Sequence, residues 1–306
     1  MASSYDVQPS FYEKIGSTIL FIGTLIKSRT LVYGFALAAI GTFFIASGFK
    51  IPDFFVIIRL TVSVYFLALA TYLYNDLTDY DVDKINKRDN AVNSKKSQYN
   101  RILYSTIGFF AMSVSLAFSI NVLTGIGSLA FLGLAIAYSH PRFHLKNIFV
   151  IKTIVTAAGG FIASLMGALA VQNVSWLALA SSFAVFLIYF INGPLNDIRD
   201  IQGDRDGGRR TIPIVIGVEK SFMLIMASIF SIALILITSY YFMGLNMMGM
   251  AMGLMVCIYL AIRIKKLSRE YENRQKMNQT RTAVRNSIFT IQISIFIGLT
   301  MNYFLS

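Results

Sequence analysis

The chain has 306 residues, of which 56% are hydrophobic and only 14% are charged, whereas ordinary globular proteins carry about 25% charged residues. Its 27 Lys and Arg residues outnumber its 15 Asp and Glu residues, so the formal net charge is +12. The basic residues form islands between long apolar runs and not a solvated face, which argues against a soluble protein and against nucleic acid as its partner.

The chain begins with an amphipathic segment at about 11–27, and we expect the N-terminal segment 1–29 to lie at a membrane interface. Nine longer apolar runs follow, each close to the roughly 20 residues that a helix needs to cross a bilayer core. The predicted spans are 30–48, 53–74, 101–119, 121–138, 148–170, 174–195, 218–242, 244–262 and 287–305. The sequence therefore predicts an all-α membrane protein with nine transmembrane helices, forming one domain over residues 1–306.

The basic residues fall on one side of this predicted topology. All of the 27 except Lys50 and Arg59 lie in the N-terminal segment, in alternate connections or close to the ends of the spans that flank them. Loops that stay in the cytoplasm are enriched in Lys and Arg. We therefore expect an integral protein of the cell membrane with its N-terminus in the cytoplasm.

Two connections on this side carry the same acidic motif. Residues 75–83 read N-D-L-T-D-Y-D-V-D and residues 196–204 read N-D-I-R-D-I-Q-G-D, so N-D-x-x-D-x-x-x-D recurs at an offset of 121 residues. On a continuous helix the four patterned positions point to about 0°, 100°, 40° and 80°, which is one face. Each copy follows an even-numbered span. This order implies two four-helix halves plus a ninth helix, with motif loops at 75–100 and 196–217 on the cytoplasmic side.

The motifs supply six candidate carboxylates. These are Asp76, Asp79, Asp83, Asp197, Asp200 and Asp204. Three carboxylates converging from each half would repel one another unless cations held them, and oxygen ligands at this density suit Mg²⁺ bound to phosphates. The pattern thus indicates a site for a diphosphate. The alternative is that these are solvated loop acids paired with neighbouring Lys and Arg, and the repeated spacing argues against it.

With these motifs the chain resembles the UbiA superfamily of intramembrane prenyltransferases. The first family signature is N-D-x-x-D-x-x-x-D, and the second, D-x-x-D-x-x-G-D-R followed by G-x-x-T-x-P, is similar to residues 197–213. A family tyrosine and lysine between spans four and five are similar to Tyr138 and Lys146. Many members continue the first motif with Arg-Pro-x-Pro-Ser-Gly, where this chain has Asn-Ala-Val-Asn-Ser-Lys at 90–95, so that family arginine has no counterpart there.

The resemblance implies a transferase that moves a prenyl chain from an allylic prenyl diphosphate to a hydrophobic acceptor in the lipid bilayer. The acceptor would be a quinone precursor or other aromatic compound, or a glycerol-phosphate ether lipid. The resemblance also implies that the six aspartates hold Mg²⁺ as the cofactor. Further expected site residues are Asn75 and Asn196 as ligand-orienting amides, Lys146, Arg205 and Arg209 as diphosphate contacts, and Tyr138, with Tyr72 second, as aromatic stabilisers of the allylic cation.

Three other functions fit parts of the pattern. A cation transporter would use the same acidic clusters, but its acids are expected near the middle of spans, whereas these lie at span ends and precede Lys and Arg. The CDP-alcohol phosphotransferases also use clustered aspartates, but their glycine and alanine-arginine elements are absent from both copies. A scaffold without activity could keep the fold. The sequence identifies neither the acceptor nor a protein partner.

Overall fold

The computed structural model describes residues 11–29, 32–48, 53–79, 99–143 and 145–305, and all regular structure in these ranges is helical. The main helices are α1 (Phe11–Ser28), α2 (Tyr33–Ser47), α3 (Phe54–Thr78), α5 (Tyr99–Ile120), α6 (Val122–Ser139), α7 (Ile151–Val171), α8 (Trp176–Arg199), α11 (Val218–Phe242), α12 (Met247–Ser268) and α13 (Arg274–Leu305). Three short helices join them: η3 (Leu145–Asn147), α9 (Ile201–Asp206) and α10 (Ile212–Ile216). The predicted all-α fold is confirmed.

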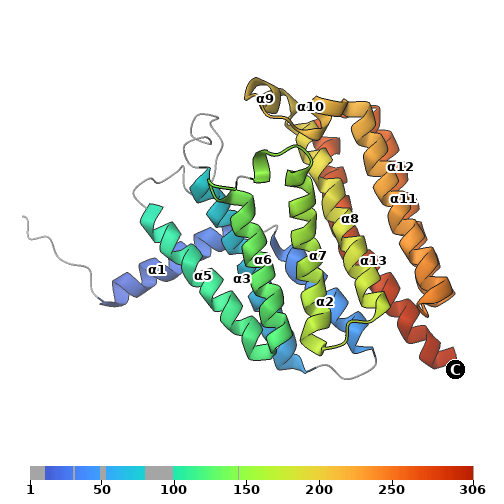
Figure 1. Cartoon of the computed structure of the whole chain (residues 1–306), viewed down its shortest axis with the longest axis horizontal. Coiled ribbons are helices and arrows are strands. Elements are labelled where there is room, and N and C mark those ends of the chain that lie inside the picture. The colour runs from blue at the N-terminus through green and yellow to red at the C-terminus, as the bar shows by residue number, and fades with distance from the viewer. Residues whose placement is uncertain (1–10, 30–31, 49–52, 80–98, 144, 306) are drawn as a thin grey trace, which may run out of the picture.

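The number of spans differs slightly from the prediction. A helix occupies each of the nine predicted positions, but only eight of the described helices are long and apolar enough to cross a membrane. The exception is α2, whose 15 residues extend for about 22 Å, less than a bilayer core of about 30 Å. The helix α1 lies obliquely to the bundle (Figure 1). The guanidinium of Arg101, at the start of α5, stacks over the Phe21 ring of α1 at 4.3 Å.

The chain order separates two similar halves, α2 to α6 and α7 to α12, while α13 packs against α2, α8 and α12 (Figure 1). The halves meet where α2 crosses α7. A Cβ added at Gly167 would lie 2.0 Å from the carbonyl oxygen of Ala39, so the two backbones approach too closely for any other residue. Small residues permit such contact between membrane helices. The predicted arrangement of two four-helix halves plus a ninth helix matches this packing order.

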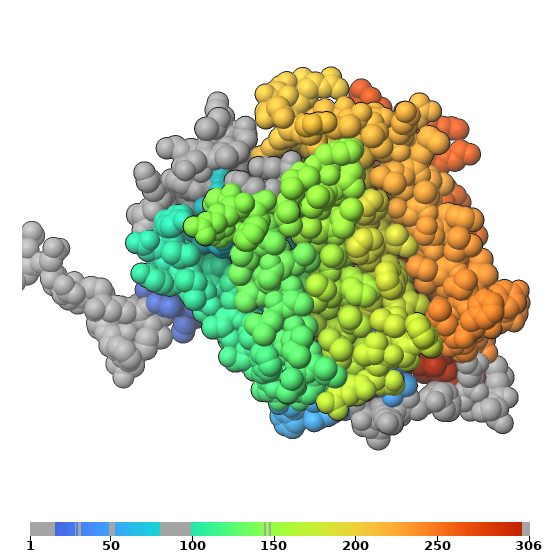
Figure 2. Space-filling view, in the orientation of Figure 1, coloured from blue at the N-terminus to red at the C-terminus, as the bar shows by residue number. Residues whose placement is uncertain are grey.

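Apolar side chains cover the outside of the bundle. In the space-filling view, the side chains of α6, α7 and α11 fill the spaces between the ribbons (Figure 2). Large exposed apolar residues on these helices include Ile126, Leu129, Ile154, Phe230 and Leu234. Large apolar side chains exposed on several helices are typical of a membrane-facing exterior, as expected of an integral membrane protein.

The last helix begins earlier than predicted. The expected span was 287–305, but α13 starts at Arg274 and has 32 residues. The prediction was wrong at this end because it assigned the basic residues 274–285 to a loop, although a helix can extend beyond the apolar core of a bilayer. Gln292 fixes this helix against α2, since its side-chain amide donates to the carbonyl of Ala38 at 2.9 Å and to the hydroxyl of Thr42 at 3.0 Å.

Candidate functional site

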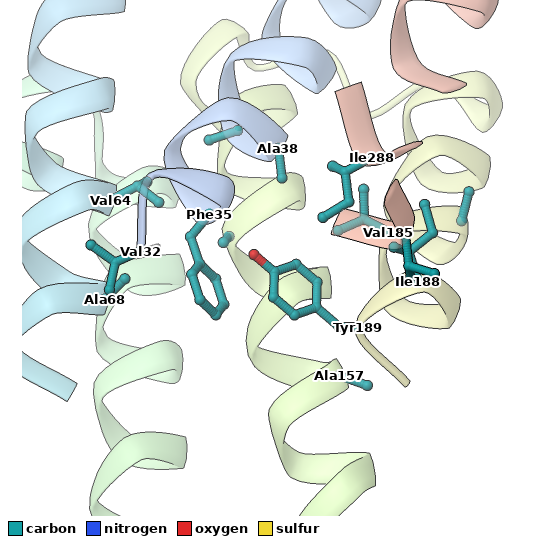
Figure 3. Close-up of a cluster of buried hydrophobic side chains, with 14 of the residues drawn as sticks. Val32, Phe35, Ala38, Val64, Ala68, Ala157, Val185, Ile188, Tyr189 and Ile288 are labelled. Atoms are coloured by element: carbon teal, nitrogen blue, oxygen red, sulfur yellow. The ribbon is translucent and has the colours of Figure 1, made fainter. Parts of the chain in front are cut away.

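A cavity of about 510 Å³ lies between α2, α3, α6, α7, α8 and α13. Its apolar part is lined by rings from three helices. Phe35 of α2 stands 4.6 Å from Tyr189 of α8 and 5.8 Å from Phe131 of α6, measured between ring centroids. Figure 3 shows Phe35 and Tyr189 pointing toward each other. One end of the cavity is therefore aromatic and suited to an apolar chain.

The polar end of the cavity lies where the two aspartate motifs begin. The first two motif residues of each copy, Asn75-Asp76 and Asn196-Asp197, are still helical, in α3 and α8. Both helices then stop at the next aspartate, because Asp79 and Asp200 are the C-caps of α3 and α8. The prediction that the motif occupies one face of a continuous helix is therefore wrong for the second copy, whose Asp204 lies on the separate helix α9, and residues 80–83 of the first copy lie outside the described residues.

The first copy is held by the connection after α6. The Nζ atom of Lys146 lies 2.6 Å from Oδ1 of Asp79 and 3.3 Å from Oδ1 of Asn75. The hydroxyl of Ser139, at the end of α6, donates to the same Asn75 oxygen at 3.1 Å. The expected lysine thus contacts two motif residues. Asp83 lies outside the described residues.

The first aspartate of each copy forms an ion pair that repeats between the halves. Nη2 of Arg29, just before α2, lies 2.5 Å from both carboxylate oxygens of Asp76. Nζ of Lys152, at the start of α7, lies 2.8 Å from Oδ1 of Asp197. The partners are 47 residues apart in the first half and 45 in the second. Sequence reasoning missed these two cations, although their similar offset from the motif was a usable signal.

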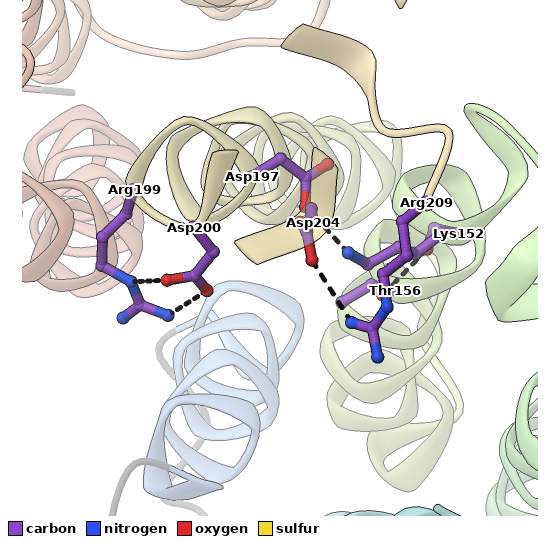
Figure 4. Close-up of polar contacts among 7 residues, drawn as sticks. All are labelled: Lys152, Thr156, Asp197, Arg199, Asp200, Asp204 and Arg209. Carbon is purple, nitrogen blue, oxygen red and sulfur yellow. Dashed lines mark hydrogen bonds and ion pairs between the residues drawn. The ribbon is translucent and has the colours of Figure 1, made fainter. Parts of the chain in front are cut away.

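The rest of the second copy forms two further ion pairs (Figure 4). Asp200 points to Arg199, whose Nη2 atom lies 2.6 Å from its carboxylate. Asp204, on α9, lies 3.4 Å from Nη1 of Arg209. Figure 4 shows Asp200 directed away from Asp197 and Asp204. Arg209, which the sequence predicts as a diphosphate contact, thus lies against a motif carboxylate.

The predicted site residues divide into three groups. Asn75, Tyr138, Asn196 and Asp197 line the cavity directly. Asp76, Asp79, Lys146, Asp200, Asp204 and Arg209 surround its polar end through the ion pairs given above. Arg205 is exposed and lines a different cavity of about 430 Å³, beside Arg199 and Arg274. The hydroxyl of Tyr138 lies near Thr156 of α7.

The carboxylates are individually paired. Over the described parts of the chain, no three acidic, histidine or cysteine side chains gather closely enough to hold one metal ion. Like charges repel, and each described motif aspartate lies against a Lys or Arg instead. Three of these acids are nevertheless not solvated loop residues, since Asp76, Asp197 and Asp204 are only 4%, 2% and 2% exposed. Buried, paired charges are costly to place and cluster at functional sites.

The cavity also contains basic residues that sequence reasoning treated only as markers of topology. Arg281 and Arg285 of α13 line it together with Asn278 and Thr282. Residues three, four and seven positions apart share one helix face, so this spacing was the available signal. The misplaced start of the last span concealed it.

Comparisons with known proteins agree with this architecture. A sequence model described as the UbiA prenyltransferase family matches residues 31–288. A relative from Sulfurisphaera tokodaii, named digeranylgeranylglyceryl phosphate synthase, is 25% identical over 80% of this chain and 87% of its own length. A relative of the same name from Methanosphaera stadtmanae is 31% identical over 49% of this chain and 54% of its own length.

Solved structures share the fold. One described as a digeranylgeranylglyceryl phosphate synthase in membranes has a TM-score of 0.74 and 17% identity, over 93% of this chain and 99% of the other. A UbiA homolog from Archaeoglobus fulgidus, bound to DMAPP and Mg²⁺, has a TM-score of 0.65 and 15% identity, over 89% and 98%. These matches give no support to the alternative of a cation transporter.

Proposed function

The chain belongs to the UbiA prenyltransferase family, and from this premise we propose that it transfers a geranylgeranyl chain from an allylic diphosphate to a glyceryl phosphate lipid. The relatives' product carries two geranylgeranyl groups on glyceryl phosphate, as their name states. The acceptor would then be a glyceryl phosphate lipid that already carries one such group. The aromatic acceptors left open by the sequence are the second choice, because none of the named relatives above points to them.

The observation that carries this proposal is the joining of two environments in one cavity. Asn75 and Asn196-Asp197, from the two repeated motifs, meet at its polar end, and aromatic rings line the remainder. A prenyl diphosphate has the same division into a highly charged head and an apolar tail. The head would therefore lie between the two motifs, with the tail among the rings and the surrounding helices.

The residues at the polar end fit Mg²⁺, which prefers carboxylate and amide oxygens. The Oδ1 atom of Asn196 is buried and has no hydrogen-bond partner, so one hard oxygen ligand is already directed into the site. Asp76, Asp197 and Asp204 are buried carboxylates around it. When bound, Mg²⁺ would neutralise the charge that develops on the departing diphosphate.

The chain's own cations would act on the same leaving group. Lys146 and Lys152 lie against motif carboxylates, and if those carboxylates take metal ions as partners, the ammonium groups can donate to phosphate oxygens instead. Charge-assisted hydrogen bonds of this kind stabilise charge where it develops. Lys152 joins Lys146 in this role through its place in the cavity wall.

The transfer itself breaks the bond between the allylic carbon and the diphosphate oxygen. A new ether bond forms between that carbon and the acceptor's hydroxyl oxygen, and the hydroxyl proton leaves with the diphosphate or to water. Positive charge on the allylic carbon would be stabilised by the faces of aromatic rings. Tyr138 is the first candidate because it lines the cavity together with Asp197, and Tyr72 is the second.

We also infer that this end of the bundle faces the cytoplasm. The distribution of Lys and Arg supports it, since all but two of the 27 lie in, or next to, connections on the motif side of the predicted topology. Arg59, one of the two exceptions, binds the carbonyl of Ser119 near the α5–α6 turn, at the end of α3 opposite its motif.

The test uses purified protein in detergent with Mg²⁺ and radiolabelled geranylgeranyl diphosphate. The acceptors are geranylgeranylglyceryl phosphate and, for comparison, a hydroxylated aromatic acid. We expect labelled product from the glyceryl phosphate, with release of one diphosphate per transfer. Transfer only to the aromatic compound would replace the proposed acceptor, and no transfer to either would overturn the proposed function.

A further inference from the structure

The wall of the cavity formed by α13 presents two guanidinium groups. Arg281 and Arg285 lie one turn apart on the face of α13 that lines the cavity, flanked by Asn278 and Thr282. Helix α13 is held in register by Gln292, two turns beyond Arg285, through its bonds to α2. The two arginines are therefore presented by a fixed helix and not by a loop.

These arginines differ from Arg29, Lys146, Lys152 and Arg209 in forming no ion pair with a motif carboxylate among the described residues. Neither forms an ion pair with a carboxylate in the described parts of the chain, and the Nε atom of each is buried without a hydrogen-bond acceptor. Arg281 donates to Oδ1 of Asn278 at 3.1 Å, and Arg285 lies 5.8 Å from the Tyr33 ring centroid. Both side chains are half-buried, and Asp200 is the carboxylate with an electrostatic effect on Arg281. Two neighbouring guanidinium groups that form no ion pair still repel each other, and a bound anion would relieve that repulsion.

The arginines of α13 and the motif aspartates have their electrostatic effects on different tyrosine hydroxyls of the cavity. The charged groups that have an electrostatic effect on the Tyr138 hydroxyl are Asp79, Asp197 and Arg209. Those that influence Tyr72 are Arg29, Arg281 and Arg285. The two phenols also influence each other, so both lie in the same space. Arg281 and Arg285 of α13 thus form the basic side of the cavity wall.

We propose that Arg281 and Arg285 bind the phosphate monoester of the acceptor lipid, in a subsite separate from the diphosphate site between the motifs. This inference rests on the proposed function, which requires two anionic substrates in one cavity. Two guanidinium groups carry a charge of +2, which matches a dianionic phosphate monoester. The planar donors of arginine also suit phosphate oxygens better than those of lysine.

The subsite would fix which part of the acceptor faces the donor. The monoester is not consumed in the transfer, so its binding on the basic side leaves the glyceryl hydroxyl free to approach the allylic carbon. Holding the head group in this way uses binding energy to orient the glyceryl hydroxyl toward the allylic carbon. An acceptor without phosphate would enter the same cavity but lack this anchor.

The same guanidinium groups could instead bind the donor diphosphate, and kinetics distinguish the two sources of phosphate. Initial rates are measured for wild type, Arg281→Gln and Arg285→Gln while each substrate is varied in turn. We expect the acceptor KM to rise about 10- to 100-fold, with the donor KM unchanged. Arg281→Lys should recover part of the loss. A rise in the donor KM alone, or no change in either KM, would overturn the proposal.

A second comparison uses the acceptor lipid lacking its phosphate. Wild type and both glutamine variants should use this neutral acceptor equally, because the contact that the substitutions remove is absent. Equal losses on both acceptors would contradict a phosphate contact. Lys220→Gln, an exposed change on α11, is the matched control and should leave both KM values unchanged.

The outcome also separates this inference from the proposed function. If wild type transfers to the glyceryl phosphate and the variants behave like wild type, the subsite is wrong and the function stands. If wild type does not transfer to the glyceryl phosphate at all, both are wrong. Thermal unfolding in detergent shows whether each variant is folded.

Discussion

The aspartate end of the cavity and its α13 wall contain similar cations in opposite settings. At the aspartate end each cation lies against a motif carboxylate, as in the pairs Arg29–Asp76 and Lys152–Asp197. On the α13 wall, Arg281 and Arg285 form no ion pair with a carboxylate among the described residues. The difference indicates that the charges at the aspartate end are balanced by ion pairs until metal ions replace the Lys and Arg partners. The charges on the α13 wall, in contrast, would be balanced by an anion from outside the chain.

The largest expected effect comes from the buried carboxylates themselves. Asp76→Ala and Asp197→Ala each remove a candidate metal ligand and leave Arg29 or Lys152 unpaired. We expect each to lower kcat by at least about 100-fold, measured as transfer of labelled prenyl chain at saturating substrate. Asp206→Ala, an exposed acid two residues from Asp204, is the control. Wild-type turnover in either variant would remove that residue from the site.

The comparison between paired and unpaired cations predicts opposite effects on stability. Lys152→Met leaves the buried carboxylate of Asp197 without its partner, which should cost about 1–3 kcal/mol of folding stability. Arg281→Gln removes a half-buried charge that forms no ion pair with a carboxylate in the described parts of the chain, so stability should stay equal or increase. Thermal unfolding of both variants in the same detergent measures the difference. Equal destabilisation by the two changes would contradict the distinction between the regions.

A smaller effect is expected at the aromatic boundary between the two regions. Tyr138→Leu removes the ring that would stabilise positive charge on the allylic carbon, an interaction worth about 0.5–2 kcal/mol. The expected loss in kcat is about 2- to 30-fold. Tyr138→Phe keeps the ring and should retain nearly all activity. If Phe and Leu reduce kcat equally, the hydroxyl of Tyr138 matters, and the ring face does not.

The smallest effect is expected at an exposed ion pair that belongs to neither region of the cavity. Glu270 and Lys276 pair across the turn between α12 and α13, and this contact lowers the pKa of the Glu270 carboxyl. A lowered pKa contributes stability at neutral pH that is lost as the pH falls through the folded-state value. Because the pair is exposed and screened by salt, Glu270→Gln should leave the unfolding midpoint at pH 7 unchanged. A clear decrease would show that this turn supports α13.

Sequence reasoning was most successful where a pattern is local or repeated. Apolar runs located the helices, and the repeated motif identified Asn75, Asn196 and Asp197, which line the cavity. It failed where tertiary packing decides. The partners of Asp76 and Asp197 lie 47 and 45 residues away along the chain. The helix break at Asp200 is a local change of backbone direction that a uniform 100° rotation ignores.

Arg281 and Arg285 illustrate the same limit. Their charges were interpreted as topology because basic residues near a span usually are. Only the early start of α13 at Arg274, and its packing against α2 and α8, place these two residues in the cavity wall. Charge position along the chain thus indicates the side of the membrane but does not separate a solvated residue from one that lines a site.

The central claim, that the two motifs together bind the diphosphate through Mg²⁺, is tested most directly by equilibrium binding of a non-transferable geranylgeranyl thiolodiphosphate. Binding to the purified wild type is measured with Mg²⁺ and with excess EDTA, and again for Asp76→Asn and Asp197→Asn. We predict tight binding only with Mg²⁺, and loss of the Mg²⁺ effect in each variant. Equal binding with EDTA, or a full Mg²⁺ effect in both variants, would contradict the account.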